Sequence, residues 1–218
     1  MTRLIKILIT GTALTILPLN LAFADGSTNG NGSNVLNGQI DFQVTSSNLN
    51  TNVATVTGNV SNASSAVGNN LEVVTLDNTH VTNDQYVSGV SISADQTANV
   101  NAVSGTVNLQ SQAICNAADV STDPHVAAVN SNQVCNANDP SSYLNANVSN
   151  IGNDVTLGAT SVGNSFSEDT NAATMPVQNQ QTNNSNIAAT VNSTVYNVNG
   201  NVSVNSSAIG NNAQIIHY

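Results

Sequence analysis

Hydrophobic and polar residues alternate along most of this chain, with Val, Ile or Ala placed one residue away from Asn, Ser or Thr. Such alternation is typical of half-buried β-strands, and β-branched residues favour extended backbone. The helix signal is weak, because Asn, Ser, Thr, Val and Gly are mediocre or poor helix formers. The pattern therefore predicts an all-β protein.

The alternation is organised into repeats. The phrase GNVSNASSAVGNN begins at Gly58 and GNVSVNSSAIGNN begins at Gly200, with ten of thirteen positions identical. Four copies align on a glycine, or its substitute, near the end of the phrase: Gly68, Cys115, Gly163 and Gly210. These anchors are separated by 47, 48 and 47 residues. Repetition at a fixed period is the signature of a solenoid or stacked array.

Each unit combines an ordered half, read as two short strands, with a variable half. The variable halves, roughly 71–94, 118–142 and 166–188, are expected to be long loops or irregular strands. Glycines and asparagines that tolerate positive φ predict breaks and tight turns in the ordered half. The predicted repeat turn positions are Gly58, Gly68, Gly105, Gly163, Gly200, Gly210, Asn69, Asn116, Asn164 and Asn211.

The predicted fold is a repetitive, β-helix-like β-solenoid with four units of 47–48 residues, the last one truncated. Equivalent residues would stack at about 4.8 Å, with apolar ladders inside and Asn side-chain ladders linking the units. A conventional β-sandwich is the alternative. The terminal QIIHY either caps the last unit, which is the default interpretation, or pairs with the open edge of another subunit.

The N-terminus has the features of an export signal. Arg3 and Lys6 precede an apolar run, and Ala22-Phe23-Ala24 has the form of a signal peptidase site. We therefore expect a signal peptide at 1–24, a flexible Gly/Asn/Ser-rich segment at 25–38 and the β-solenoid domain at 39–218. No later apolar run approaches the length of a membrane span, so a secreted, cell-surface protein is expected.

The distribution of charged residues along the chain excludes two kinds of binding partner. Arg3 and Lys6 are the only Lys or Arg residues, and all 12 Asp and Glu follow residue 24. The processed chain would have no Lys or Arg side chain to neutralise phosphate, which excludes nucleic-acid partners. Polybasic docking on membranes is excluded for the same reason.

The chain has two cysteines, Cys115 and Cys135. In an exported protein this pair favours a disulfide that stabilises by about 3 kcal/mol in the chain-entropy model. No metal-ligand spacing or nucleophile motif accompanies the histidines, serines or acids. We expect no catalytic, cofactor-binding or metal-binding residues, and no enzyme. A β-helical polysaccharide hydrolase, which needs only two carboxylates, is the weakest alternative.

The S-x-A-[VI]-G-N word, set among Val/Asn-rich strands behind a signal peptide, resembles the holdfast-attachment proteins of stalked bacteria, of the HfaD type. More distantly it is similar to curlin-like functional amyloid subunits, although these repeats are about twice as long and lack the curlin Ser/Gln spacing. The resemblance implies export through a curli-type pore and a role in attaching cells to surfaces or anchoring adhesive polysaccharide.

Two functions follow as hypotheses. The first is a secreted structural protein acting in adhesion, as a surface anchor or fibre subunit, that associates with itself, with related fibre subunits or with surface polysaccharide. The alternative is a soluble extracellular module that binds carbohydrate or another surface ligand on a monomeric solenoid.

Overall fold

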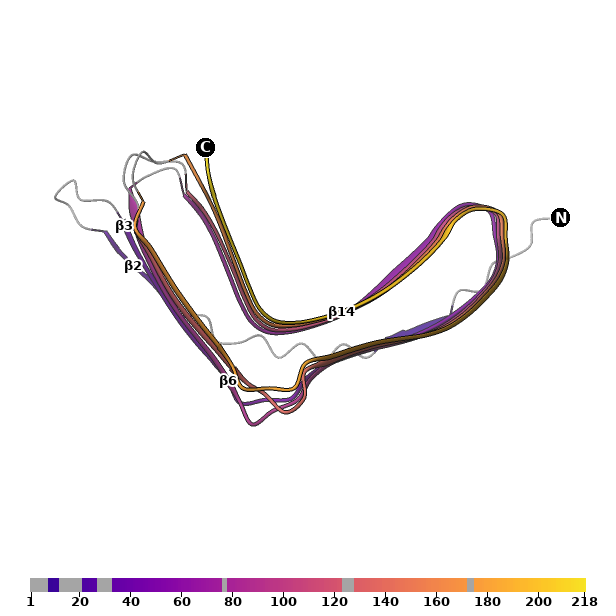
Figure 1. The fold of residues 1–218 in the computed structure, drawn as a ribbon, viewed down its shortest axis with the longest axis horizontal. Helices are drawn as coiled ribbons and strands as arrows, with labels where there is room; N and C mark the ends of the chain where they lie inside the picture. The colour runs from indigo at the N-terminus through magenta and orange to yellow at the C-terminus, as the bar shows by residue number, and fades with distance from the viewer. Residues whose placement is uncertain (1–7, 12–20, 27–32, 76–77, 123–127, 172–174) are drawn as a thin grey trace.

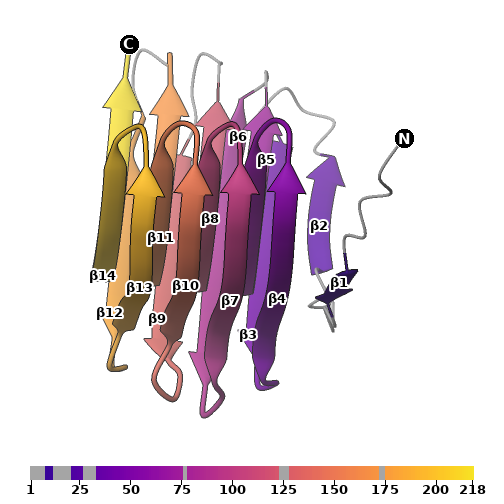
Figure 2. The same ribbon diagram turned by 90° about the vertical axis from the view of Figure 1, so that its right-hand side faces the viewer.

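The structure, a computed structural model, describes residues 8–11, 21–26, 33–75, 78–122, 128–171 and 175–218. The described chain consists of β-strands with short connections and contains no helix. It winds through four coils of three strands each, and the coils lie side by side (Figures 1 and 2). The β-solenoid prediction is confirmed.

Each coil gives one strand to each of three parallel sheets. Sheet B contains β3 (Ser33–Asp41), β6 (Thr79–Ser88), β9 (Ala128–Asn136) and β12 (Val177–Asn183). Sheet A contains β4 (Thr45–Val56), β7 (Ile92–Val103), β10 (Ser141–Ile151) and β13 (Ala188–Val198). Sheet C contains β5 (Val60–Thr75), β8 (Val107–Thr122), β11 (Val155–Thr170) and β14 (Val202–His217). Two further strands, β1 (Leu8–Gly11) and β2 (Leu21–Gly26), pair antiparallel with β4 and β3.

Neighbouring coils are in register at the repeat spacing. The column formed by Val60, Val107, Val155 and Val202 shows the alignment. Every copy of the repeated phrase therefore pairs with the copy beside it, which explains why the chain repeats the phrase. A conventional β-sandwich does not produce this parallel pairing at 47–48 residues.

The strands of sheet C are long and bend midway, so one sheet covers the other two (Figure 1). Their first halves pack on sheet A around Val107, Leu109 and Leu157. Their second halves pack on sheet B around Val120, Val129 and Phe166. A third cluster fills the corner between them and includes both cysteines. The core is thus thin and built mainly from Val, Ala, Leu and Ile.

Several boundaries differ from the predictions. The variable halves are not mainly loops: each contributes a regular strand, β6, β9 or β12, to sheet B. The first coil begins at Ser33, inside the segment predicted to be flexible, of which 27–32 lies outside the described residues. The fourth coil has all three strands, because a coil starts in sheet B rather than at the repeated phrase. QIIHY does not form a cap, since it continues β14 alongside β11.

Candidate functional site

The disulfide prediction is confirmed. Cys115 in β8 and Cys135 in β9 form a bond with their Cα atoms 5.9 Å apart, and both residues are fully buried. The bond joins sheet C of the second coil to sheet B of the third, across the corner cluster. It therefore ties two coils together, with an expected stabilisation of about 3 kcal/mol.

The predicted turn glycines fall into two groups. Gly58, Gly105 and Gly200 lie in the connections from sheet A to sheet C, and Gly58 has φ +120°. The other three glycines lie within strands of sheet C, and the four repeat asparagines form the column one residue further along these strands: Gly68, Gly163, Gly210, Asn69, Asn116, Asn164 and Asn211. The predicted tight turn at these positions is wrong, because the chain remains in a strand.

Close approach between coils explains two of the three glycines inside sheet C, Gly68 and Gly163, whereas a Cβ on Gly210 would meet only Asn183 Nδ2 at 3.4 Å. A Cβ on Gly163 would lie 2.3 Å from the carbonyl oxygen of Gly210, and one on Gly68 would lie 2.7 Å from that of Cys115. Real Cβ atoms do not approach backbone this closely. Glycine is needed there because neighbouring coils meet at the bend, rather than because a turn requires positive φ.

The asparagine column forms a continuous ladder through the buried bend. Asn69 Nδ2 donates to Asn116 Oδ1 at 2.9 Å, and Asn116 Nδ2 donates to Asn164 Oδ1 at 2.8 Å. Asn164 Nδ2 donates to Asn211 Oδ1 at 2.8 Å. The same nitrogens also donate to backbone carbonyl oxygens of sheet B: Asn69 Nδ2 donates to Tyr86 O, and Asn164 Nδ2 donates to Thr182 O. Each carboxamide thus joins its own coil to the next one.

A glutamine ladder, not predicted from the sequence, lies beside it. Its members are Gln39, Gln85, Gln133 and Gln181 of sheet B. Each Nε2 after the first donates to the Oε1 of the preceding coil, at 3.1, 2.8 and 2.8 Å. The same nitrogens also donate to sheet C carbonyl oxygens. The glutamine donors point toward the N-terminal coil, whereas the asparagine donors point toward the C-terminal coil.

Two buried polar residues outside the ladders, Gln96 and Glu168, have no side-chain hydrogen-bond partner in the described part of the chain. Gln96 occupies a column with Leu49 and Leu144, and neither of its amide atoms has a hydrogen-bond partner. Glu168 occupies a column with Val120 and Ile215, and both its oxygens are unpartnered. Burial raises the pKa of Glu168 from its ordinary value of 4.5 to about 7.

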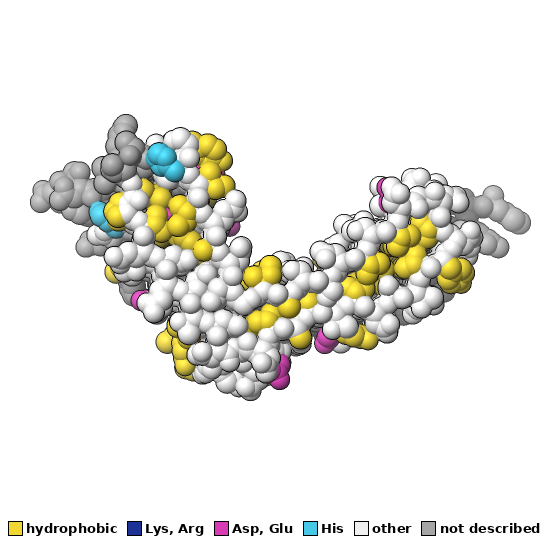
Figure 3. All heavy atoms as spheres, viewed as in Figure 1, with side chains coloured by type: hydrophobic (Ala, Val, Ile, Leu, Met, Phe, Trp, Pro, Cys, Tyr) yellow, Lys and Arg dark blue, Asp and Glu magenta, His cyan; other side chains and the backbone are white. Residues whose placement is uncertain are grey.

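The two ends of the stack differ from its interior. Val155 and Leu157 in coil 3 are fully buried, but their partners in coil 4, Val202 and Val204, are 49% and 51% exposed. Figure 3, which looks along the stack, shows hydrophobic side chains in a stripe across this end. At the other end, β5 forms the edge of sheet C. Within the described residues, both ends of sheet C present unpaired strand edges.

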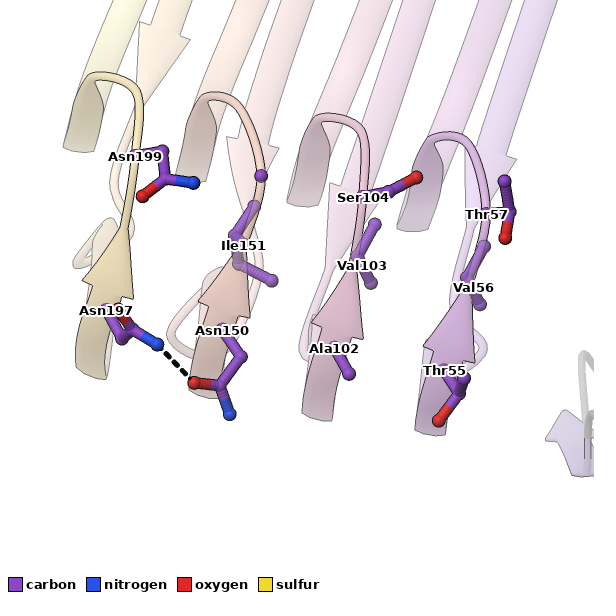
Figure 4. Close-up of a pocket in the computed structure, with 11 residues that line it drawn as sticks. Thr55, Val56, Thr57, Ala102, Val103, Ser104, Asn150, Ile151, Asn197 and Asn199 are labelled. Atoms are coloured by element: carbon purple, nitrogen blue, oxygen red, sulfur yellow. Dashed lines mark hydrogen bonds between the residues drawn. The ribbon is translucent and has the colours of Figure 1, made fainter.

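A groove follows the tips of the coils, where sheet A passes into sheet C. Its volume is about 440 Å³, and its lining includes Val56, Ser104, Asn150, Ile151, Asn197 and Asn199 (Figure 4). It runs along a column of left-handed residues with φ between 54° and 60°: Thr55, Ala102, Asn150 and Asn197. Asn197 donates to Asn150 in this column. The lining contains neither acids nor bases.

Ionisable groups do not gather into a reactive site in the described part of the chain. No group of three or more His, Cys, Asp or Glu residues there is placed to hold a metal ion. The carboxyls with raised pKa, Asp95 and Glu168, owe the shift to burial and lie in different strands. The described residues also include no helix long and apolar enough to cross a membrane.

These features define a class of protein: a four-coil parallel β-solenoid held together by buried amide ladders and one disulfide. The family model for holdfast attachment protein D matches residues 54–217. The chain therefore belongs to the holdfast attachment protein D family, whose name indicates surface adhesion at the cell exterior. No curated protein and no solved structure matches the chain.

Proposed function

We propose that this chain is an exported structural protein of the cell surface that acts in adhesion, as an anchor or a fibre subunit. The observation that supports this most strongly is the unbroken stack of columns through all four coils, in a member of a holdfast attachment family. Buried, hydrogen-bonded amide networks rigidify a structure. A rigid stack suits a load-bearing link better than a catalyst.

The charge distribution agrees with this role. All acids follow residue 24, and the two cations precede it, so removal of the predicted leader leaves no Lys or Arg. Such a surface avoids nucleic acid and anionic membranes. Its contacts with a partner would be hydrogen bonds, strand edges and apolar stripes.

The experiment is a gene deletion in the source organism, complemented with the wild type, with Asn116→Ala or with Asn192→Ala. Asn116 is a buried ladder residue, whereas Asn192 donates to Asn145 Oδ1 at 3.3 Å on the exposed surface. We expect wild type and Asn192→Ala to restore surface adhesion and to be accessible to protease on intact cells, and Asn116→Ala to restore less. Normal adhesion without the gene, or a protein shielded from protease, would contradict the proposal.

The groove supports a second candidate, a module that binds a neutral extended polymer such as a polysaccharide. Every coil contributes at least one amide or hydroxyl group to its lining, beside apolar Val56 and Ile151. Ser104→Tyr would fill the groove, and Thr97→Tyr would place the same side chain at another exposed position of the second coil. Polysaccharide binding by the monomer that Ser104→Tyr alone abolishes would favour this candidate; equal binding by both variants would exclude the groove.

A further inference from the structure

Building on the proposed structural role, we propose that the open face of coil 4 binds coil 1 of a second copy, so that chains join head to tail into one continuous solenoid. All three sheets agree on the register of this joint. Gln181 and Gln39, Val195 and Val53, and Asn211 and Asn69 are each 142 residues apart. One offset therefore aligns sheets B, A and C together.

The polarity of the ladders matches across such a joint. Asn211 Nδ2 forms only a 3.3 Å bond to the Gln181 carbonyl oxygen. At the opposite end, Asn69 Oδ1 is buried and has no hydrogen-bond partner. A buried acceptor without a donor is costly. Stacking coil 4 on coil 1 of another copy places the donor of Asn211 at this acceptor, as in the three coil steps within the chain.

The glutamine ladder continues in the opposite sense. Within the chain, each Nε2 donates to the Oε1 of the preceding coil. At the joint, Gln39 of the second copy would donate to Gln181 Oε1, the acceptor end of the ladder. Two antiparallel ladders fit only when coil 4 meets coil 1, because coil 4 against coil 4 would oppose donor to donor in one ladder and acceptor to acceptor in the other.

The apolar columns and the charges also fit. Val202 and Ile215 are about half exposed on coil 4, and their columns begin with Val60 and Val73 in coil 1. No acid occurs after Asp169. The carboxylates of coil 1, including Glu72, would therefore face a coil that contains no Asp or Glu side chain.

The N-terminal strands define when the joint can form. In the full chain β2 occupies the edge of β3, and β1 occupies the edge of β4. These edges are the ones to which β12 and β13 of another copy would add. Removal of the predicted leader, 1–24, takes away β1 and most of β2, and so opens coil 1 for addition of strands.

Cysteine pairs test the register. Ser61 and Ser203 are exposed ends of one column, roughly 14 Å apart within a chain but roughly 4.8 Å apart across the joint. Only the latter distance permits a disulfide. We expect exported Ser61→Cys/Ser203→Cys protein to form covalent multimers larger than dimers on oxidation, built from processed chains. The control pair, Ser61→Cys with Asn205→Cys, is two residues out of register, so its Cα atoms would lie roughly 8 Å apart across the joint. That distance is too long for a disulfide, so the control should form no multimers larger than dimers.

Three results of the crosslinking experiment would overturn the proposal. The first is equal multimer formation by the control pair. The second is crosslinking only between like positions of two copies, Ser61→Cys to Ser61→Cys and Ser203→Cys to Ser203→Cys, which would show head-to-head and tail-to-tail contacts. The third is multimers that consist of unprocessed chains.

A charge variant tests the ladder at the joint. Asn211→Asp keeps the oxygen that accepts from Asn164 but replaces the donor that would face Asn69 of the next copy. Asn212→Asp adds the same charge one residue away, on an exposed side chain. We expect Asn211→Asp to raise the concentration needed for association about tenfold or more and Asn212→Asp to change it little, as measured by sedimentation. Equal effects of the two variants would overturn the ladder joint.

The two proposals fail separately. Loss of head-to-tail association with normal cellular adhesion would leave a single solenoid acting as an anchor. Association in the test tube without any effect of gene deletion on adhesion would instead remove the proposed function.

Discussion

The buried amides of the two ladders and the buried Gln96 and Glu168 lie in the same thin core, yet their surroundings differ. Asn116 has amide partners in the coils before and after it. Gln96 lies between leucines, and neither of its amide atoms is bonded. In a solenoid a buried polar group gains hydrogen bonds when its column is polar in successive coils, whereas a lone polar residue bears the desolvation cost.

The largest effect should come from breaking the ladder. Asn116→Ala removes the acceptor for Asn69 and the donor to buried Asn164 Oδ1. We expect the free energy of unfolding to fall by about 2 to 4 kcal/mol, measured by denaturant titration. The control Asn192→Ala, which removes only the exposed bond to Asn145, should cost less than about 0.5 kcal/mol. Similar losses for both variants would show that the buried ladder bonds stabilise no more than an exposed bond.

The corner glycine should come next. Gly163→Ala forces a Cβ to within 2.3 Å of the Gly210 carbonyl oxygen, directly before the ladder residue Asn164. We expect a loss of about 1 to 3 kcal/mol, read from the same titration. Gly38→Ala, where a Cβ meets nothing within 4 Å, is the matched control and should be nearly neutral. A neutral Gly163→Ala would refute the close approach of the coils at the bend.

Replacing an unpartnered buried polar residue with an apolar one should stabilise the protein. Gln96→Leu matches its column neighbours Leu49 and Leu144 and removes two unpartnered buried atoms. We expect a gain of about 1 to 2 kcal/mol, measured as a higher denaturant midpoint. A destabilised Gln96→Leu would mean that the amide has an energetic role that its column does not reveal.

The second lone residue should make stability depend on pH. Because burial raises the pKa of Glu168 from 4.5 to about 7, the unfolded chain loses this proton at lower pH than the folded chain. Its contribution to stability is fully present below about pH 4.5, falls as the pH rises through 7, and then levels off. Thermal unfolding of wild type minus Glu168→Gln across pH 4 to 9 isolates this dependence; a flat difference would contradict it.

The sequence predicted the period, the all-β class, the asparagine ladder and the cysteine pair, because the repeated phrase aligns these residues directly. It did not predict the third strand of each coil, since β6, β9 and β12 share little more than the glutamine column and scattered valines. Gln39, Gln85, Gln133 and Gln181 recur at nearly the same spacing. Aligning the variable halves on them would have revealed the second ladder.

The backbone conformations at the tips of the coils and at the bend of sheet C were harder to predict. Thr55 and Ala102 adopt left-handed backbone although neither residue type favours it, and only the asparagines of the third and fourth coils give a local signal. At Gly68 and Gly163 the Gly-Asn sequence predicts a turn, but the chain stays extended because it pairs with the strand of the neighbouring coil.

The central claim is that continuous buried amide ladders hold the coils together. Hydrogen exchange of side-chain carboxamide protons, followed by NMR on the processed monomer, tests it most directly. We predict that Asn116, Asn164 and Gln133 exchange far more slowly than exposed Asn192, because their protons are bonded inside the stack. Exchange of all four side chains at the same unprotected rate would contradict the ladder account.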